Sequence, residues 1–315
     1  MTAVRYAGLD LGGTNIKTVV VERDADGEIR VLSRRSHLTH GHEGADAVVD
    51  RVAALARAVT GEYGAAAVGL GIPGWFDPAS GCARLIPNIP GEWSGKQLRR
   101  PVETAAGRPV VLINDARAFA LAESRLGAAR GLNTVVCVTL GTGMGGGVVI
   151  GGRLHMGTGD AGEIGHQTLQ VDGPLCGCGN RGCAEALVSS AAVLRMSGRS
   201  SVEEVYEAAR AGDERAVRTV DHVIRWLAVA LVNAYTLLAP DALVIGGGVA
   251  AAGDALFGPL EREVRGRITL GRPEDVRVLP AVLGTYAGAL GAALAVLERD
   301  ENGPVGKQGE NGRIS

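Results

Sequence analysis

The chain has 315 residues, which is enough to bury a large core and to form two domains. Its 32 Lys and Arg residues against 34 Asp and Glu residues give a net charge of −2, and this balance excludes a basic surface field for nucleic acid or for an anionic membrane. The N-terminus enters a strand pattern directly, without an apolar segment of the signal-peptide type, so we expect a soluble, cytoplasmic protein.

Apolar, β-branched runs that alternate with glycine turns dominate the first part of the chain. A hairpin is predicted around Gly12-Gly13-Thr14-Asn15, because two such runs flank this turn. Apolar residues then recur at helical spacing from Val48 to Val59, and another helix is predicted after Asp115. The predicted strands of this part are 4–9, 16–22, 29–34, 66–71 and 110–114, and the second helix covers 116–125.

The second part of the chain repeats this theme around a second glycine turn at 141–146. Apolar residues from Val220 to Leu238 mark one face of a long helix, which Pro240 ends. Three glycines, Gly246-Gly247-Gly248, follow the next predicted strand. The other predicted elements are strands at 134–140, 147–150 and 242–245, a closing helix at 288–298 and a polar, Gly-rich disordered tail at 299–315.

The repeated strand–turn–strand unit predicts an α/β protein with two similar lobes and a cleft between them. We expect a small N-terminal α/β lobe at 1–117 and a large α/β lobe at 118–287. The helix at 288–298 is expected to return to the small lobe, ahead of the tail.

Two glycine-rich segments, 69–74 and 141–146, fit the pattern G-x-G-x-x-G. A dinucleotide-binding site requires a helix that opens at the last glycine. We predict a turn at 75–78 after the first segment and a strand at 147–150 after the second, so neither segment predicts the dinucleotide-binding site of a dehydrogenase. Glycine turns between paired strands can instead direct backbone N–H groups at phosphate oxygens.

Four potential metal ligands, His166, Cys176, Cys178 and Cys183, lie close together in the sequence. One His and three Cys form a complete ligand set for a tetrahedral structural zinc. Disulfides and free buried thiols are the alternatives, but the glycines between the cysteines favour a tight metal-binding loop. Because a closed zinc site has no open position, we interpret the metal as a staple that orients the flanking carboxylates of Glu163 and Glu185.

Several motifs together resemble one family. Asp10-Leu11-Gly12-Gly13-Thr14 resembles the first phosphate motif of the actin-like ATPase and sugar kinase superfamily, Thr139-Leu140-Gly141-Thr142-Gly143 its second, and Gly246-Gly247-Gly248 its adenosine motif. Asn114-Asp115-Ala116 and the segment 163–185 narrow the resemblance to the ROK family, and within it to zinc-containing bacterial glucokinases. The motifs span 10–290 in the family's order, which implies two ribonuclease-H-like lobes with an interlobe cleft.

The resemblance implies roles for the residues near the sugar. Asp115 is expected to be the general base that accepts the proton of a sugar hydroxyl, and Asn114 to bind neighbouring hydroxyls. Glu163, His166 and Glu185 are expected to bind hydroxyls at the C1–C3 side, with His166 also ligating zinc through its other ring nitrogen. Gly74 is a further candidate for the sugar pocket. A helix N-cap at Asp115 and a tight turn at Gly74 are the structural alternatives.

The resemblance also implies ATP, Mg²⁺ and structural Zn²⁺ as cofactors. Asp10 is expected to orient Mg²⁺ through water. Backbone groups of the three glycine motifs are expected to contact the nucleotide, although the third motif also fits a simple connection between a strand and a helix. The expected contacts are Gly12, Gly13, Thr14, Gly141, Thr142 and Gly143 with the phosphates and Gly246, Gly247 and Gly248 with the nucleoside.

These expectations describe an ATP-dependent sugar kinase that phosphorylates the 6-hydroxyl of a glucose-type hexose. An aminosugar kinase, for kanosamine, N-acetylmannosamine or N-acetylglucosamine, and a non-catalytic sugar sensor are the alternatives. Two departures from the glucokinase pattern, at 186–190 and at Tyr286, leave the sugar open. The family's repressors carry a DNA-binding domain ahead of the first phosphate motif, so Asp10 leads us to expect no nucleic-acid partner. The resemblance also implies a homodimer or homotetramer.

Overall fold

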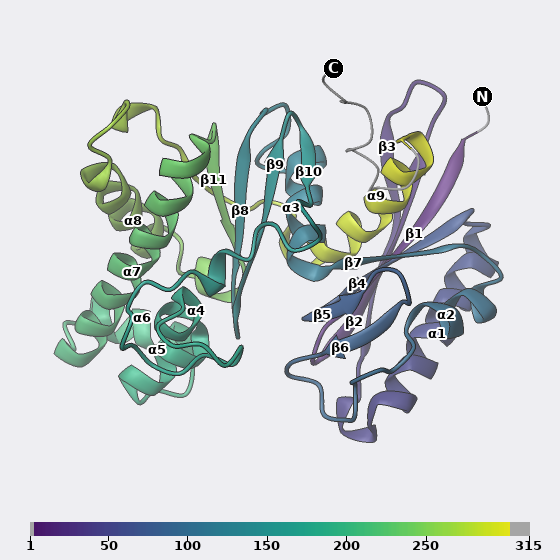
Figure 1. Cartoon of the computed structure of the whole chain (residues 1–315), viewed down its shortest axis with the longest axis horizontal. Coiled ribbons are helices and arrows are strands. Elements are labelled where there is room, and N and C mark those ends of the chain that lie inside the picture. The colour runs from purple at the N-terminus through teal and green to yellow at the C-terminus, as the bar shows by residue number, and fades with distance from the viewer. Residues whose placement is uncertain (1–2, 303–315) are drawn as a thin grey trace, which may run out of the picture. The chain divides into compact units, whose positions relative to one another are not determined.

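A computed structural model describes residues 3–302 of the chain, and its contacts divide these residues into two compact units (Figure 1). The first unit holds the residues up to Ala118 and those from Tyr286 onward, and the second unit is Phe119–Thr285. The segment 303–315, which contains most of the predicted tail, lies outside the described residues.

The first unit is built on a five-stranded sheet with the strand order β3-β2-β1-β4-β7. The first three strands of the chain pair antiparallel, whereas β1, β4 and β7 run parallel. Its elements are β1 (Val4–Leu11), β2 (Asn15–Arg23), β3 (Ile29–Leu38), η1 (Gly41–Glu43), α1 (Ala45–Tyr63), β4 (Ala67–Ile72), β5 (Trp75–Asp77), β6 (Cys82–Leu85), α2 (Arg99–Ala106), β7 (Val110–Asn114), the start of α3 (Asp115–Leu126) and α9 (Ala287–Asn302).

Two helices cover this sheet by different means. Because side chains alternate along β1, Leu9 and Leu11 share a face, and they join the buried apolar side chains of α1 in one core cluster. The opposite face presents Gly8 and its register partner Gly69 to α9. A Cβ added at either glycine would overlap a backbone carbonyl oxygen of α9, so the absence of side chains lets this helix lie directly on the strands.

This close approach predicts that Gly69→Ala destabilises the protein by about 2 kcal/mol or more, since overpacking without room to adjust forces the backbone apart. Gly61→Ala is the matched control, because Gly61 is an exposed residue of α1 with nothing within 4 Å of an added Cβ. That control is expected to stabilise the protein by ~0.5–1 kcal/mol through lower chain entropy. Urea unfolding of the two variants checks the contrast. Equal midpoints would contradict it.

The second unit repeats the topology of the first, with the strand order β10-β9-β8-β11-β12. Again three antiparallel strands are followed by parallel ones, as β8 pairs with β11 and β11 with β12. Its elements are the rest of α3, then β8 (Val135–Leu140), β9 (Met144–Ile150), β10 (Arg153–His155), η2 (Ile164–His166), α4 (Ala184–Val188), α5 (Ser190–Ser197), α6 (Val202–Arg210), α7 (Glu214–Leu238), β11 (Ala242–Gly246), η3 (Gly248–Ala252), α8 (Asp254–Arg267), η4 (Pro273–Asp275), β12 (Val278–Pro280) and η5 (Gly284–Tyr286). The predicted α/β fold class with two similar lobes is confirmed.

Three sequence predictions were wrong in detail. The segment after Gly74 is strand β5 and not a turn, because it pairs with β6. The second glycine turn is shorter than predicted, since β9 begins at Met144 and only Gly141–Gly143 remain outside the strands. The closing helix α9 continues to Asn302, past the predicted end at 298.

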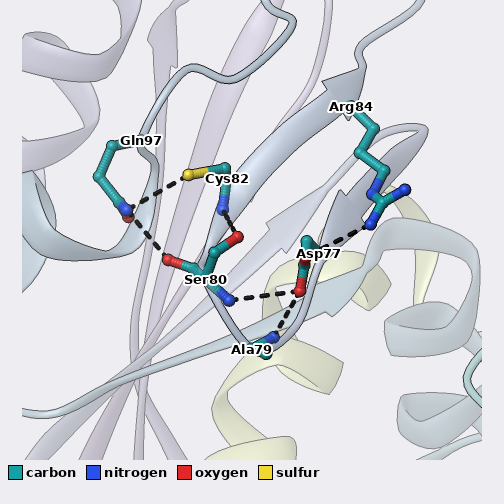
Figure 2. Close-up of polar contacts among 6 residues, drawn as sticks. All are labelled: Asp77, Ala79, Ser80, Cys82, Arg84 and Gln97. Carbon is teal, nitrogen blue, oxygen red and sulfur yellow. Dashed lines mark hydrogen bonds and ion pairs between the residues drawn. The ribbon is translucent and has the colours of Figure 1, made fainter.

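The turn predicted after Gly74 lies a few residues further along, between β5 and β6 (Figure 2). Asp77 Oδ1 accepts the backbone N–H of Ala79 (2.8 Å) and of Ser80 (3.3 Å), and these bonds hold the pKa of Asp77 below its usual range. Gln97 Nε2 donates to the carbonyl oxygen of Ser80 (2.9 Å) and to Cys82 Sγ (3.4 Å). The hairpin that follows Gly74 is therefore fixed at its tip.

No helix within residues 3–302 combines the length and the apolar character that a membrane span requires.

Candidate functional site

In the first unit, the predicted site residues gather where the parallel strands end. Asp10 of β1 lies opposite Gly71 of β4, and Ile72 lies opposite Asn114 of β7. Since the carboxyl ends of parallel strands share one edge of a sheet, Asp10, Gly74, Asn114 and Asp115 occupy the same edge. Ligands of open α/β sheets bind outside this edge.

Asp10 is enclosed by backbone and by one opposite charge. Its carboxylate lies against the positions where Gly71 and Gly288 lack a Cβ, and an added Cβ at Gly288 of α9 would lie 2.5 Å from Asp10 Oδ2. The loss of hydration raises its pKa from 3.8 to about 6, partly offset by Lys17, its cross-strand register partner. Asp10 is partly buried, and a carboxylate with reduced hydration is suited to a cation or to a cation's bound water.

The raised pKa predicts that Asp10→Asn stabilises the protein at neutral pH. The folded state holds the Asp10 proton more tightly than the unfolded state, so wild-type stability falls as pH rises from about 4 through about 6. An amide cannot ionise, and the variant should therefore gain up to about 3 kcal/mol at pH 8 and nothing at pH 3.5. Urea unfolding without added Mg²⁺ at both pH values tests this prediction, with Asp24→Asn as control. An equal gain at both pH values would contradict it.

The first glycine turn is closed by its own backbone and by the residue that follows β3. Gly12 N donates to the carbonyl oxygen of Asn15 (3.0 Å). Thr39, which is fully buried, donates from Oγ1 to the carbonyl oxygen of Gly12 (2.7 Å) and from its N–H to that of Thr14 (2.9 Å). Thr39 therefore positions the turn, although sequence reasoning missed it because nothing near residue 39 marks a contact with residues 12–14.

Asn114 acts first as a structural residue. Its Oδ1 accepts the backbone N–H groups of Ala116 (3.1 Å) and Arg117 (3.2 Å) at the start of α3, and its Nδ2 donates to the carbonyl oxygen of Gly74 (3.2 Å). Asp115 Oδ1 also accepts the N–H of Ala116 (2.8 Å). Asn114 therefore caps α3, and the half-buried Asp115 is the first residue of the helix, so the alternative of an N-cap at Asp115 is wrong.

Gly74 has a structural reason of its own to be glycine. Its φ is 79°, and a Cβ would collide with Leu85 and Pro87. The tight-turn alternative accounts for this residue, and the bond from Asn114 fastens it beside the strand edge.

In the second unit, the other two glycine motifs meet at the corresponding sheet edge. Gly141 N donates to the carbonyl oxygen of Gly143 (2.9 Å) and closes the turn between β8 and β9, with Thr142 at its tip. Gly246 of β11 lies opposite Thr139 of β8, and an added Cβ at Gly247 would overlap backbone atoms of Leu140. The turn and the three-glycine motif are therefore neighbours.

Packing and backbone conformation explain some of the glycines in these motifs but not others. An added Cβ at Gly246 would strike the ring of Phe119, so packing explains this glycine, and Gly247 has a φ of 93°. Gly141 and Gly248 have nothing within 4 Å of an added Cβ. Open space above exposed backbone is what an approaching nucleotide requires.

The predicted metal ligands converge. Side-chain ligand atoms of His166, Cys176, Cys178 and Cys183 all lie within 4.8 Å of one another. Cys178 Sγ is 3.7 Å from Cys183 Sγ, and Cys176 Sγ is 3.8 Å from His166 Nδ1. Sulfur ligands at about 2.3 Å in a tetrahedron lie about 3.8 Å apart, so the ligand set and its spacing fit zinc. All five cysteines are free thiols, and the disulfide alternative is not realised.

Local backbone bonds bring these ligands together. Cys183 pairs with Thr168 in an isolated antiparallel bridge, and Ala184 N donates to the carbonyl oxygen of Gln167 (2.9 Å), which places the third cysteine beside His166. Burial raises the pKa of the Cys176 and Cys183 thiols. A bound cation would offset this cost, since zinc binds the thiolate form.

The two predicted carboxylates lie on either side of the cluster in the chain. Glu163 precedes η2, where its carbonyl oxygen accepts the N–H of His166 (3.0 Å), and its side chain is exposed. Glu185 lies in the first turn of α4, two residues after the last cysteine, and is half-buried. Its Oε1 accepts from Cys176 Sγ (3.4 Å), and its Oε2 accepts from the N–H of Met144 (2.9 Å). Sequence reasoning did not find this second contact.

Known proteins resemble this chain over nearly its whole length. A glucokinase from Thermotoga maritima is 35% identical over 319 residues, which cover 95% of this chain and 99% of the relative. An N-acetyl-D-glucosamine kinase from Vibrio cholerae is 31% identical over 305 residues, covering 91% of this chain and 98% of the relative.

Two solved structures share the fold. A ROK hexokinase from Thermus thermophilus has a TM-score of 0.81 at 38% identity and covers 95% of this chain and 100% of its own. A ROK family glucokinase from Streptomyces griseus, in complex with glucose and AMPPNP, has a TM-score of 0.78 at 35% identity and covers 92% and 98%. A family model described as the ROK family matches residues 6–299. The resemblance inferred from the motifs is confirmed, and the chain belongs to the ROK family.

Proposed function

We propose that this protein is an ATP-dependent, hexokinase-type phosphotransferase that transfers the γ-phosphate to the 6-hydroxyl of a glucose-type hexose. One observation supports the proposal above all others: a ROK family glucokinase solved in complex with glucose and AMPPNP is 35% identical to this chain and covers 92% of it. The gathering of Asp10, Asn114 and Asp115 at the carboxyl edge of one sheet supports it.

Asp115 is the proposed general base. As the sugar O6 attacks the γ-phosphorus, its proton passes to the Asp115 carboxylate, and the bond from the γ-phosphorus to the bridging oxygen breaks and releases ADP. The anchoring of the helix start by Asn114 holds this carboxylate in place. The second N–H of Asn114 Nδ2 is its proposed contact with a sugar hydroxyl.

The sugar's C1–C3 hydroxyls are the proposed ligands of Glu163, His166 and Glu185. Nδ1 of His166 faces the thiol of Cys176, which leaves Nε2 for a hydroxyl. Zinc bound by this histidine and the three cysteines would supply a rigid anchor and no catalytic position. Gly74 is a proposed backbone contact in the same pocket.

The glycine motifs are the proposed nucleotide contacts. The backbone of residues 12–14 and 141–143 would face the phosphates, and the backbone of residues 246–248 the nucleoside. The N–H groups of Gly12 and Gly141 close their own turns, which leaves those of the residues after them as the proposed donors. Asp10 would hold Mg²⁺ through water, and Mg²⁺ would neutralise charge on the transferring phosphate. The raised pKa of Asp10 supports this role, because a cation is what a poorly hydrated carboxylate lacks.

An aminosugar kinase is the second candidate, favoured by the similarity to an N-acetyl-D-glucosamine kinase. ADP release with MgATP over a panel of glucose, glucosamine, 3-amino-3-deoxyglucose, N-acetylglucosamine and N-acetylmannosamine separates the candidates. The highest kcat/KM is expected for glucose. A preference for an aminosugar would replace the first candidate by the second, and sugar binding without any turnover would support a sensor. A cytoplasmic homodimer or homotetramer without nucleic-acid partners stays a prediction.

A further inference from the structure

The second glycine turn, residues 141–143, is held at both ends by the segment that follows the cysteine cluster. Ser190 N donates to the carbonyl oxygen of Gly141 (2.8 Å), at the start of the turn. Glu185 Oε2 accepts the N–H of Met144 (2.9 Å), directly after its end. Helix α4 therefore contacts the turn through the side chain of Glu185, and the start of α5 contacts it through the backbone of Ser190.

Gly143 shows how closely the carboxylate approaches. A Cβ built on Gly143 would lie 2.5 Å from Glu185 Oε2, well inside van der Waals contact. This glycine has an ordinary negative φ, so conformational freedom does not require it. The space taken by Glu185 accounts for glycine at position 143.

The two carboxylate oxygens of Glu185 have separate neighbours. Oε2 is used by the turn, whereas Oε1 is 3.4 Å from Cys176 Sγ in the cluster. In the metal-bound cluster, sulfur binds as thiolate and has no proton to donate. Oε1 would then be the oxygen available to a sugar hydroxyl.

We propose that Glu185 is a positioning residue for the second phosphate turn as well as a sugar ligand, and that it couples sugar binding to nucleotide binding. A hydroxyl on Oε1 would fix the carboxylate, and Oε2 would then hold the Met144 N–H and the turn in their binding arrangement. Such coupling is reciprocal, so sugar raises nucleotide affinity by the same factor by which nucleotide raises sugar affinity. The inference rests on the proposed kinase function.

The test is the affinity of sugar-free protein for Mg²⁺-AMPPNP, measured by calorimetric titration. Glu185→Ala removes the bond to the turn and is expected to weaken AMPPNP binding roughly three- to tenfold, the effect of one hydrogen bond. Glu185→Gln keeps a carbonyl acceptor for Met144 and should bind AMPPNP like the wild type while losing sugar affinity. Should the alanine variant fold poorly, Glu185→Asp is the substitute, because its shorter side chain does not reach Met144.

A double-mutant cycle with Gly143 isolates the contact itself. Gly143→Ala should weaken AMPPNP binding in the wild type, where the new methyl group displaces the carboxylate. In the Glu185→Ala background the space is empty, and the same change should have a much smaller effect.

Two outcomes decide the inference. Weaker AMPPNP binding in Glu185→Ala, near wild-type binding in Glu185→Gln and non-additive effects with Gly143→Ala would support it. Unchanged AMPPNP affinity in sugar-free Glu185→Ala, with sugar affinity reduced, would overturn the positioning role and leave the kinase proposal intact. Failure of the kinase proposal is read separately, from wild-type turnover on the sugar panel.

Discussion

Replacing Asp115 by Asn is expected to lower kcat by about 100- to 10,000-fold, the usual contribution of a positioned general base. The amide has nearly the same shape and can still accept the N–H of Ala116, so the start of α3 should stay intact. Because the amide cannot take a proton from the sugar hydroxyl, the loss should fall on kcat, with the Kd for glucose changed by only a few-fold. Single-turnover ADP release and glucose titration measure the two quantities.

The matched control for this variant is Asp24→Asn. Asp24 also accepts backbone N–H groups in a turn, from Asp26 (3.0 Å) and Glu28 (2.9 Å), but it follows β2 at the end of the sheet away from the first glycine turn. It should therefore retain wild-type turnover. A near-normal kcat in Asp115→Asn would exclude the general-base role. An equal loss of glucose affinity and kcat would instead indicate that Asp115 acts as a sugar ligand.

Most of the correctly predicted helices and strands could be recognised from local sequence patterns. The strands around both glycine turns are β-branched runs with clear ends, and the long helix α7 has a continuous apolar face. Helix α6 was missed although Ser201 and Glu204 have the spacing of a capping box, and the structure shows the Ser201 hydroxyl accepting the N–H of Glu204 (3.2 Å). Strand β5 was missed because its three residues form a strand only through pairing with β6.

The metal cluster could be predicted because residue type alone identifies it. One His and three Cys within a short segment have few other uses. Residues whose role depends on long-range contacts left no such signal. The buried carboxylate of Glu123 accepts N–H groups from Ala128 (2.8 Å) and Leu283 (2.9 Å), 160 positions away in the second case. The Asp10–Lys17 pair did follow from the hairpin register and could have been foreseen.

Loss of the metal is expected to affect the sugar more than the nucleotide. Cys178→Ser removes one of four zinc ligands at an exposed position, so the purified variant should contain no zinc where the wild type contains one per chain. Without the ion, His166, Glu163 and Glu185 lose their common anchor. Glucose affinity should then fall at least about tenfold, the effect of one or two misplaced hydrogen bonds. Elemental analysis and glucose titration measure both effects.

Cys82→Ser is the matched control, because Cys82 is a free thiol of the β6 strand that accepts a hydrogen bond from Gln97 and lies outside the ligand set. It should keep its zinc and its glucose affinity. The AMPPNP affinity of Cys178→Ser shows whether loss of the metal also affects nucleotide binding. If metal loss acts on the turn through Glu185 alone, AMPPNP binding should weaken by no more than in Glu185→Ala, since the bond from Ser190 to Gly141 remains. A larger loss of AMPPNP affinity would mean that the ion stabilises the whole second unit, and zinc-free protein with normal glucose affinity would refute the anchoring role.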